Sequence, residues 1–449
     1  MTRERDLAQM FEHRLGASQA DSAEVFHQQV SQLDITCFEE EITGCTRAQR
    51  EGFAVRTLRG RRMGSSFSER VAPDAVDSAL TRALDQCGFF PPDEGAVIYP
   101  GTGELFEDSR YRRDMAEIPL EQKQDFTRKL ERAARALDKK IITVPQAKYA
   151  EYHRAVTVVT TSGLKKSEIS SFCGAVLQVT AKKGRQTHTY SVNAASDSFF
   201  ALSPLRLAQE AVMGVLEKMN PKPVESGSYP AVLSQEAASR LLGAFFLSPH
   251  SHVYAENALR GRSRFAPGKQ AASREVTIYD NPRGSTPYAR MFDDEGVPAN
   301  KQMLIREGVV TGLAYSVSAA RREKTAPTGH SLRGGYRGAA ATGLHAPCLA
   351  NGEAESEELM DACREGVYIT ELDGLHAGLD PVTGNFSLSA RGFVVHRGKK
   401  GKPLGQCTVA GNLFELLAGI TARGCDRRDD TFRRFSAPSL LISRLSVST

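Results

Sequence analysis

A helix is predicted to begin within the stretch Ser234-Gln235-Glu236-Ala237-Ala238-Ser239-Arg240. Ser234 is a good N-cap, because its hydroxyl can accept a hydrogen bond from a backbone amide of the first turn. Over residues 235–247, apolar side chains recur at helical spacing, namely Ala238, Leu241, Leu242 and Phe245. We therefore expect a helix that starts at Gln235 and packs one face into a core.

The first turn of this helix has the frame of a zinc-protease helix, His-Glu-x-x-x-His. In that motif two imidazoles hold the ion, and the glutamate beside the first one activates water. Glu236 keeps the glutamate, but Gln235 and Arg240 stand at the two imidazole positions. A neutral amide is a poor zinc ligand and a guanidinium cannot be one. We predict that this helix forms no zinc site and that Glu236 pairs with Arg240 one turn later.

Several further blocks of the C-terminal half carry a family resemblance that covers nearly the whole chain. They include Phe292-Asp293-Asp294-Glu295-Gly296-Val297-Pro298 and the segments 308–315, 366–370, 380–387, 410–413 and 438–442. Together they resemble the TldD/PmbA family of bacterial proteins, once described as modulators of DNA gyrase.

The resemblance implies a division of labour between two branches. TldD chains carry His-Glu-x-x-x-His and a cysteine near the C-terminus as zinc ligands, whereas the PmbA branch, also called TldE, lacks them and pairs with TldD in a protease for peptides and unfolded segments. This chain departs from TldD at Gln235 and Arg240, and its segment 429–434 contains no cysteine. It is therefore similar to PmbA, with no metal or other cofactor expected in this chain and zinc expected in a TldD-like partner. For the isolated chain a homodimer is an alternative.

Two classes of function follow. The first is a TldE-like subunit that supplies substrate binding and assembly to a zinc protease complex, with roles such as peptide maturation or antitoxin-type turnover. The second is a regulatory binding protein of the gyrase-modulator type without a proteolytic role.

Composition agrees with a cytoplasmic protein of ordinary core size. At 449 residues with 41% hydrophobic residues, the chain should divide into roughly two or three domains. The 58 Lys and Arg residues exceed the 53 Asp and Glu residues only slightly and are dispersed, which disfavours a nucleic-acid partner. We expect no membrane span, because no apolar run is long enough, and reduced thiols in the cytoplasm, because the N-terminus is charged and the eight cysteines form no Cys-x-x-Cys pair.

The periodicity predicts an α+β protein. We expect a first α+β unit at 1–95, a surface connection at 96–119, and a second α+β unit at 120–220 that shares one mixed sheet with the first, flanked by helices. The paired prolines at Asn220-Pro221-Lys222-Pro223 mark a stiff boundary. Beyond it, 228–449 reads as a mainly antiparallel, barrel-like β domain with convincing helices only at Gln235 and at 413–420.

Two segments are candidates for peptide binding. Ser331-Leu332-Arg333-Gly334-Gly335-Tyr336-Arg337-Gly338 is a glycine-rich, basic loop whose amides could cradle an anion or admit a peptide backbone. We favour a mobile surface loop, with Arg333, Gly334 and Gly335 as the candidate contacts. Asn385, Phe386 and Ser387 form the second candidate segment.

The remaining candidates for chemistry have simpler structural explanations. His250 and His252 could ligate a metal, with Cys407 or Cys425 completing a relocated hydrolase site, but they lack a convincing third ligand nearby and buried structural thiols are the better interpretation. Asp293-Asp294-Glu295 could attract a hard cation, yet three adjacent side chains in an extended chain cannot all face one ion. A turn that needs no metal is the favoured interpretation.

Overall fold

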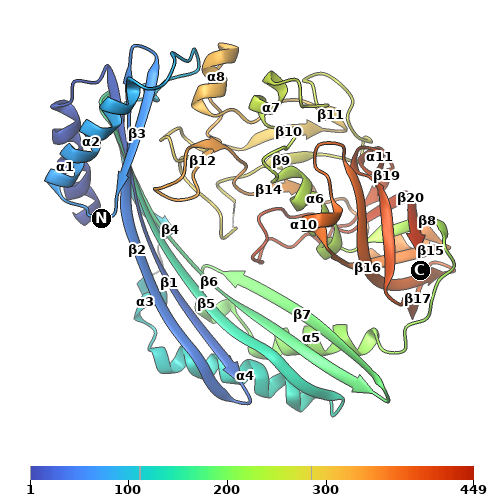
Figure 1. Cartoon of the computed structure of the whole chain (residues 1–449). Coiled ribbons are helices and arrows are strands. Elements are labelled where there is room, and N and C mark those ends of the chain that lie inside the picture. The colour runs from blue at the N-terminus through green and yellow to red at the C-terminus, as the bar shows by residue number, and fades with distance from the viewer. Residues whose placement is uncertain (1, 111–112, 285) are drawn as a thin grey trace.

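A long, curved sheet forms the N-terminal half of the chain (Figure 1). The computed structural model describes residues 2–110, 113–284 and 286–449. The sheet runs in the order β3-β2-β1-β5-β6, and both β4 and β7 pair with β6. Its strands are β1 (Ser22–Phe38), β2 (Glu41–Arg59), β3 (Arg62–Ser68), β4 (Gly103–Arg110), β5 (Ile141–Thr160), β6 (Leu164–Lys183) and β7 (Gln186–Ser196).

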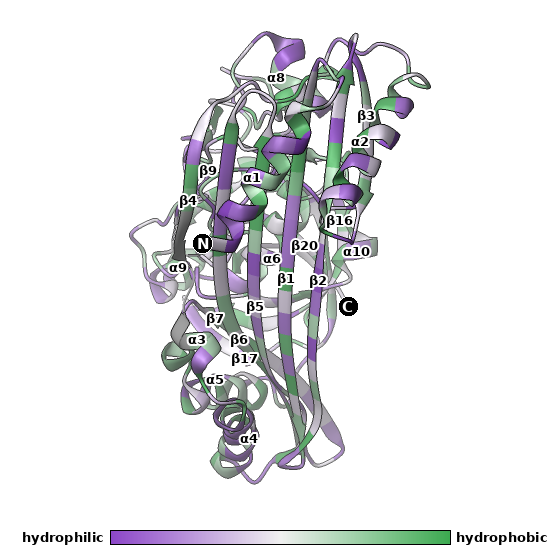
Figure 2. Cartoon of the chain, turned by 90° about the vertical axis from the view of Figure 1, so that its left-hand side faces the viewer, coloured by the Kyte–Doolittle hydropathy of each residue, from purple (hydrophilic) through white to green (hydrophobic). Residues whose placement is uncertain are grey.

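One face of this sheet is covered by helices. Figure 2 shows α1 and α2 at the upper end of the long strands and α4 at the lower end. The helices of this half are α1 (Thr2–Gly16), α2 (Pro73–Cys87), α3 (Arg113–Glu117), α4 (Leu120–Leu137) and α5 (Pro204–Glu217), with a 3-10 turn η1 (Phe199–Ala201). Two apolar cores result, one under α1 and α2 and one under α4 and α5.

The alternation of side chains along a strand divides the sheet residues between the two faces. Along β1, Val25 and Ile35 join the helix-covered cores. Residues at the alternate positions of β1 point to the opposite face. Phe26 packs on Phe292 of the C-terminal half, and Gln28 lines a cavity between the sheet and that half. The concave face of the sheet therefore receives the C-terminal half of the chain (Figure 1).

A closed barrel is the centre of the C-terminal half. Five strands follow one another in the order β15-β8-β20-β18-β16, and β16 pairs back onto β15. They are β8 (Gly227–Leu233), β15 (Gly366–Asp373), β16 (Asn385–His396), β18 (Cys407–Asn412) and β20 (Leu440–Ser448). Only β8 and β15 run parallel in this ring. The predicted α+β class with a barrel-like, mainly antiparallel C-terminal half is confirmed.

Shorter elements surround the barrel. The additional strands are β9 (Ile278–Asp280), β10 (Gln302–Arg306), β11 (Val309–Val310), β12 (Ser331–Leu332), β13 (Ala341–Thr342), β14 (Pro347–Leu349), β17 (Lys399–Pro403) and β19 (Ile420–Arg423). The helices are α6 (Gln235–Phe246), α7 (Ala255–Leu259), α8 (Val317–Glu323), α9 (Ser356–Cys363), α10 (Leu375–Gly378) and α11 (Leu413–Ala418).

The helix predicted at Gln235 is α6. The Ser234 hydroxyl accepts a hydrogen bond from the Ala237 amide at 3.2 Å, as expected of an N-cap. The predicted apolar stripe is buried in the largest apolar cluster of the C-terminal half, with Leu241, Leu242 and Phe245 each at most 1% exposed. Burial of this stripe fixes the orientation of the polar first turn.

Two expectations about secondary structure were incomplete. The segment 96–119, expected to be a surface connection, contains β4, which adds a parallel strand to β6, and α3; residues 111 and 112 of that segment lie outside the described residues. The C-terminal half also has α7, α8, α9 and α10 in addition to the two expected helices. All four have eight residues or fewer, too short to show a helical period in sequence. No helix of the described residues is long and apolar enough to cross a membrane.

Candidate functional site

The polar residues at the start of α6 are engaged by other parts of the chain. The carboxylate of Glu236 accepts two hydrogen bonds from the guanidinium of Arg433, one of them from Nε to Oε2 at 2.8 Å and the other from Nη2 to Oε1. Arg240 instead lies 3.6 Å from Asp373 at the end of β15. The predicted Glu236–Arg240 pair is therefore wrong. The guanidinium of Arg433 bonds both carboxylate oxygens in a fork, which is the strong geometry of such pairs, so neither oxygen of Glu236 is left for Arg240.

This donor set is unlike the one that zinc takes in proteins. Structural and catalytic zinc sites use thiolate, imidazole and carboxylate donors. Gln235 offers a neutral amide, Arg240 offers only donors, and both oxygens of Glu236 are held by Arg433. Among the described residues, no three His, Cys, Asp or Glu side chains come together as a group that could hold a metal ion.

The segment that carries Arg433 also joins the two halves of the molecule. Its Asp430 carbonyl accepts the Ala195 amide of β7 at 2.8 Å, and its Phe432 amide donates to Asn193 at 3.2 Å. The neighbouring Phe432 carbonyl accepts the hydroxyl of Tyr288 at 2.5 Å. The first turn of α6 is therefore connected through one short segment to the concave face of the sheet.

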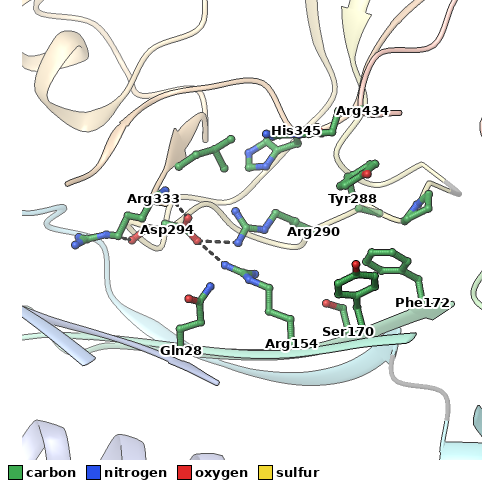
Figure 3. Close-up of a pocket in the computed structure, with 14 residues that line it drawn as sticks. Gln28, Arg154, Ser170, Phe172, Tyr288, Arg290, Asp294, Arg333, His345 and Arg434 are labelled. Carbon is green, nitrogen blue, oxygen red and sulfur yellow. Dashed lines mark hydrogen bonds and ion pairs between the residues drawn. The ribbon is translucent and has the colours of Figure 1, made fainter. Parts of the chain in front are cut away.

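A cavity of about 300 Å³ lies between that concave face and the C-terminal half (Figure 3). We call it the arginine pocket. In Figure 3 Gln28, Arg154 and Ser170 rise from the sheet on one side, and Tyr288, Arg290 and His345 lie on the other. The side chains that matter for its chemistry are Gln28, Tyr152, Arg154, Ser170, Phe172, Tyr288, Arg290, Asp294, Arg333, His345 and Arg434.

Asp294 is the only carboxylate among the described residues that line the arginine pocket, and it is fully engaged. Its Oδ1 accepts hydrogen bonds from Arg290 at 2.8 Å and Arg154 at 3.0 Å, and its Oδ2 accepts the backbone amide of Arg333 at 2.8 Å. Burial alone would raise the pKa of Asp294, but the guanidiniums of Arg290 and Arg154 hold that pKa well below its usual range. Burial, together with the charge of Arg290, lowers the pKa of Arg154 to about 10. Two guanidiniums therefore compete for one carboxylate.

Arg333 belongs to the glycine-rich segment 331–338 but is held in place. Its side chain is 2% exposed, pairs with Glu24 of β1 and stacks over the Phe26 ring with 4.8 Å between the guanidinium carbon and the ring centroid. The interpretation of this segment as a mobile surface loop is wrong at Arg333, because an ion pair with the sheet fixes it. Gly334 is exposed, and Gly335 has a φ of +102°, a conformation that suits glycine.

Asp293 and Glu295, on either side of Asp294, point to other partners. Asp293 accepts the backbone amides of Glu295 and Val297, each at 2.9 Å, and closes the expected turn. Glu295 lies 2.7 Å from Arg56 of β2. The three carboxylates thus diverge, as their adjacency requires. All three are buried, however, and nothing in the local sequence indicates that Asp294 and Glu295 bind arginines of the sheet.

Two groups of the arginine pocket keep hydrogen-bonding capacity. The Nε2 of His345 donates to the Gly329 carbonyl at 2.7 Å, while its Nδ1 has no partner among the described residues. Burial lowers the pKa of His345 to about 3, so the ring is neutral at pH 7 and Nδ1 is an acceptor. Arg434 donates to the carbonyls of Leu344 and His345, and within the described ranges it forms no ion pair with a carboxylate.

Aromatic side chains form the other end of the arginine pocket. The rings of Tyr152 and Phe172 stack with centroids 4.9 Å apart, and Tyr288 approaches Phe172 at 6.1 Å. A second cavity of about 490 Å³ adjoins this end and shares Ser170 and Phe172 with it. The space between the two halves therefore continues beyond the arginines.

The second predicted binding segment lies elsewhere. Phe386 is 5% exposed and belongs to the barrel core, whereas Asn385 and Ser387 are exposed on β16. Phe386 lines a groove formed with β18 and β20. Arg333 lines the arginine pocket instead, so the structure does not bring the two predicted segments into one cavity.

The residues of the relocated-site alternative are separate as well. Both ring nitrogens of His252 are bonded, Nδ1 to the Arg264 amide at 2.9 Å and Nε2 to the Pro381 carbonyl at 3.2 Å, while His250 is exposed. Cys407 is buried against the Ala390 carbonyl, and burial raises its pKa. A hydrogen bond to Glu355 raises the pKa of Cys425. Neither thiol has the lowered pKa of a nucleophile.

Comparisons with known proteins show which family has this architecture. Three family models match in order along the chain: PmbA/TldA metallopeptidase domain 1 at residues 23–87, the central domain at 113–218 and the C-terminal domain at 226–449. The chain belongs to the PmbA/TldD metallopeptidase family. The resemblance inferred from the sequence blocks is thereby confirmed.

Members of the PmbA/TldD family match over almost the full length. The metalloprotease PmbA of Escherichia coli O157:H7 is 22% identical over 448 residues, covering 97% of this chain and 94% of the relative. The crystal structure of a putative modulator of a DNA gyrase from Thermotoga maritima superposes with a TM-score of 0.89 at 23% identity, covering 98% of this chain and 100% of the other. The structure of TldE from Thermococcus kodakarensis gives a TM-score of 0.86 at 21% identity, with 99% of each chain covered. At this identity the structural matches establish the fold.

Proposed function

We propose that this chain is a PmbA/TldE-like subunit of a TldD/TldE-type zinc metallopeptidase complex that cleaves peptides or unfolded segments. In this proposal the chain supplies substrate binding and assembly, and a TldD-like partner supplies the zinc site. The observation that carries the proposal is the Glu236–Arg433 pair at the start of α6.

The pair matters because a catalytic glutamate must reach a metal-bound water. As a general base, Glu236 would need a free carboxylate oxygen within hydrogen-bond distance of that water. Arg433 takes both oxygens, and the flanking Gln235 and Arg240 supply no imidazole. Because the carboxylate of Glu236 is paired with an arginine of the same chain, a non-catalytic role for this helix is supported.

The space between the two halves supports the substrate-binding part of the proposal. The arginine pocket and the adjoining cavity share lining residues, so the space continues from one into the other. Clefts between structural units are common ligand sites. Two adjoining cavities can hold successive residues of an extended chain.

Reconstitution tests this proposal. The purified chain is mixed with its TldD-like partner, and cleavage of an unstructured peptide and zinc content are measured for each subunit and for the mixture. We expect cleavage only in the mixture, loss of cleavage with a chelator, and zinc in proportion to the partner alone. Glu236→Gln in this chain should leave cleavage unchanged.

Two outcomes would contradict the proposal. One tightly bound zinc per copy of this chain, with cleavage by the chain alone, would place the chemistry here. Cleavage by the partner alone at the full rate would instead favour the regulatory alternative.

A further inference from the structure

The arginine pocket carries more positive charge than its own carboxylates balance. Arg333 and Arg56 pair with Glu24 and Glu295, and Asp294 is shared between Arg154 and Arg290. Glu168 reaches Arg290 only at 3.9 Å, and its Oε2 accepts the Met291 amide at 2.7 Å. Arg434 donates to the two carbonyls described above and lies over the Tyr288 ring, and it has no ion pair with a carboxylate of the described residues. Buried guanidiniums are normally paired, so this cavity is suited to an anionic group brought by a ligand.

The cavity remains open to such a ligand. The side chains of Arg154 and Arg290 are 23% and 12% exposed, so both are largely desolvated yet reachable. A carboxylate that enters between them would form charge-assisted hydrogen bonds in a poorly solvated site, where such bonds are strongest.

The free acceptor of His345 narrows the choice of anion. Its Nδ1 needs an N–H or O–H donor, which a bare carboxylate does not provide. The last residue of a peptide provides both groups, since its terminal carboxylate lies two bonds from its own amide nitrogen. The nearby Gln28 amide can bond the next peptide unit, as either donor or acceptor.

The aromatic side chains at one end of the arginine pocket indicate which kind of side chain the ligand carries. Phe172 and Tyr288 offer ring surfaces at the side of the cavity away from Gln28 (Figure 3), and the Tyr152 ring stacks on Phe172. Aromatic walls favour apolar or aromatic side chains. The adjoining cavity of about 490 Å³ can hold the rest of an extended segment.

We propose that the arginine pocket binds the C-terminal carboxylate of a peptide, with Arg154, Arg290 and Arg434 holding the carboxylate and His345 Nδ1 accepting the amide of the last residue. This inference rests on the proposed function in taking a peptide as the ligand. It adds the end of the peptide that this subunit recognises, and a preference for an apolar last residue.

Fluorescence anisotropy on the purified full chain tests the proposal. Three labelled, unstructured hexapeptides are compared: one ending in phenylalanine with a free carboxylate, the same peptide amidated, and an amidated peptide with an internal aspartate. A charge-assisted hydrogen bond is worth enough for the free acid to bind roughly tenfold more tightly than the amide. Equal affinities for acid and amide would overturn the proposal. Equal binding of the amidated aspartate peptide would show that the pocket recognises acidic side chains instead of a terminus, which also overturns it.

Substitutions in the arginine pocket test whether its arginines cause the preference for the free acid. Arg154→Gln should weaken binding of the free acid about tenfold and remove the preference for acid over amide. The variant should fold, since Asp294 keeps Arg290 and the Arg333 amide as partners and the repulsion between Arg154 and Arg290 is relieved. Arg434→Gln should act in the same direction. The matched control is Arg132→Gln, which removes an exposed guanidinium from α4 on the helix-covered face of the sheet and should leave binding unchanged. Unaltered binding by both pocket variants would overturn the assignment.

The two proposals fail in different ways. If binding discriminates acid from amide but the mixture with the partner does not cleave peptides, the pocket assignment stands and the subunit role falls. If the mixture cleaves free and amidated peptides alike and the chain binds both equally, the subunit role stands and the pocket assignment falls.

Discussion

The start of α6 and the arginine pocket are both built from carboxylates and guanidiniums, but they balance their charges differently. At α6 one carboxylate meets one guanidinium in a forked pair, and both side chains are more than a quarter exposed. In the arginine pocket one buried carboxylate serves two guanidiniums and a backbone amide, and Arg434 pairs with no carboxylate of the described residues. A balanced pair closes a site to ligands, whereas an unbalanced cluster retains the capacity to bind one. The same chain thus has one site whose charges are balanced and one whose charges are not.

The largest expected effect comes from removing the shared carboxylate. Asp294→Asn leaves Arg154 and Arg290 buried with only the more distant Glu168, 3.9 Å from Arg290, as a counter-charge, and breaking a buried ion pair in this way costs about 3–5 kcal/mol of unfolding free energy. Urea unfolding of the variant and the natural chain measures the loss. Adding Arg154→Gln to the variant should recover part of it, because one unpaired guanidinium is removed. A variant within about 1 kcal/mol of the natural chain would show that the pocket does not depend on this carboxylate.

Acid should act on the same contact with a smaller effect. The pKa of Asp294 is lowered in the folded protein, so its contribution to stability is complete above the pKa of about 3.9 that it has when unfolded, and is lost as the pH falls below that value. The unfolding free energy of the natural chain should therefore decrease more steeply below about pH 4 than that of Asp294→Asn. Urea unfolding at a series of pH values gives both curves. Parallel curves would mean that Asp294 has the same pKa in the folded and the unfolded chain.

The smallest effect is expected at α6. Glu236→Gln breaks a pair that is partly exposed, and exposed pairs contribute about 0–1 kcal/mol. Arg433→Gln should behave alike, since it removes the same contact. Urea unfolding of both variants tests this, and a loss much larger than about 1 kcal/mol would indicate that the pair is structurally essential. The ratio between this loss and that of Asp294→Asn measures how far the two sites differ.

Sequence alone predicted the features that depend on local periodicity. The N-cap at Ser234, the apolar stripe of α6 and the barrel-like β half follow from spacing of residues that are close in the chain. The arginine pocket could not be predicted in this way, because its groups come from distant segments: Arg154 and Asp294 are 140 positions apart. The run Asp293-Asp294-Glu295 was noticed, but its arginine partners were not, since arginines on two strands and one loop look like ordinary surface charge in sequence.

The error at Glu236 has the same origin. Spacing of four within a helix suggested Arg240 as the partner, whereas Arg433, 197 positions away, takes the carboxylate. Local rules state which contacts are available, and tertiary contacts decide between them.

The segment that carries Asp430, Phe432 and Arg433 has a mechanical consequence. It is hydrogen-bonded to β7 on one side and to α6 on the other, so the sheet and the barrel cannot move apart unless those bonds break. The amide of Ala195 is protected by this segment, and its rate of hydrogen exchange therefore reports how often the two halves separate in solution.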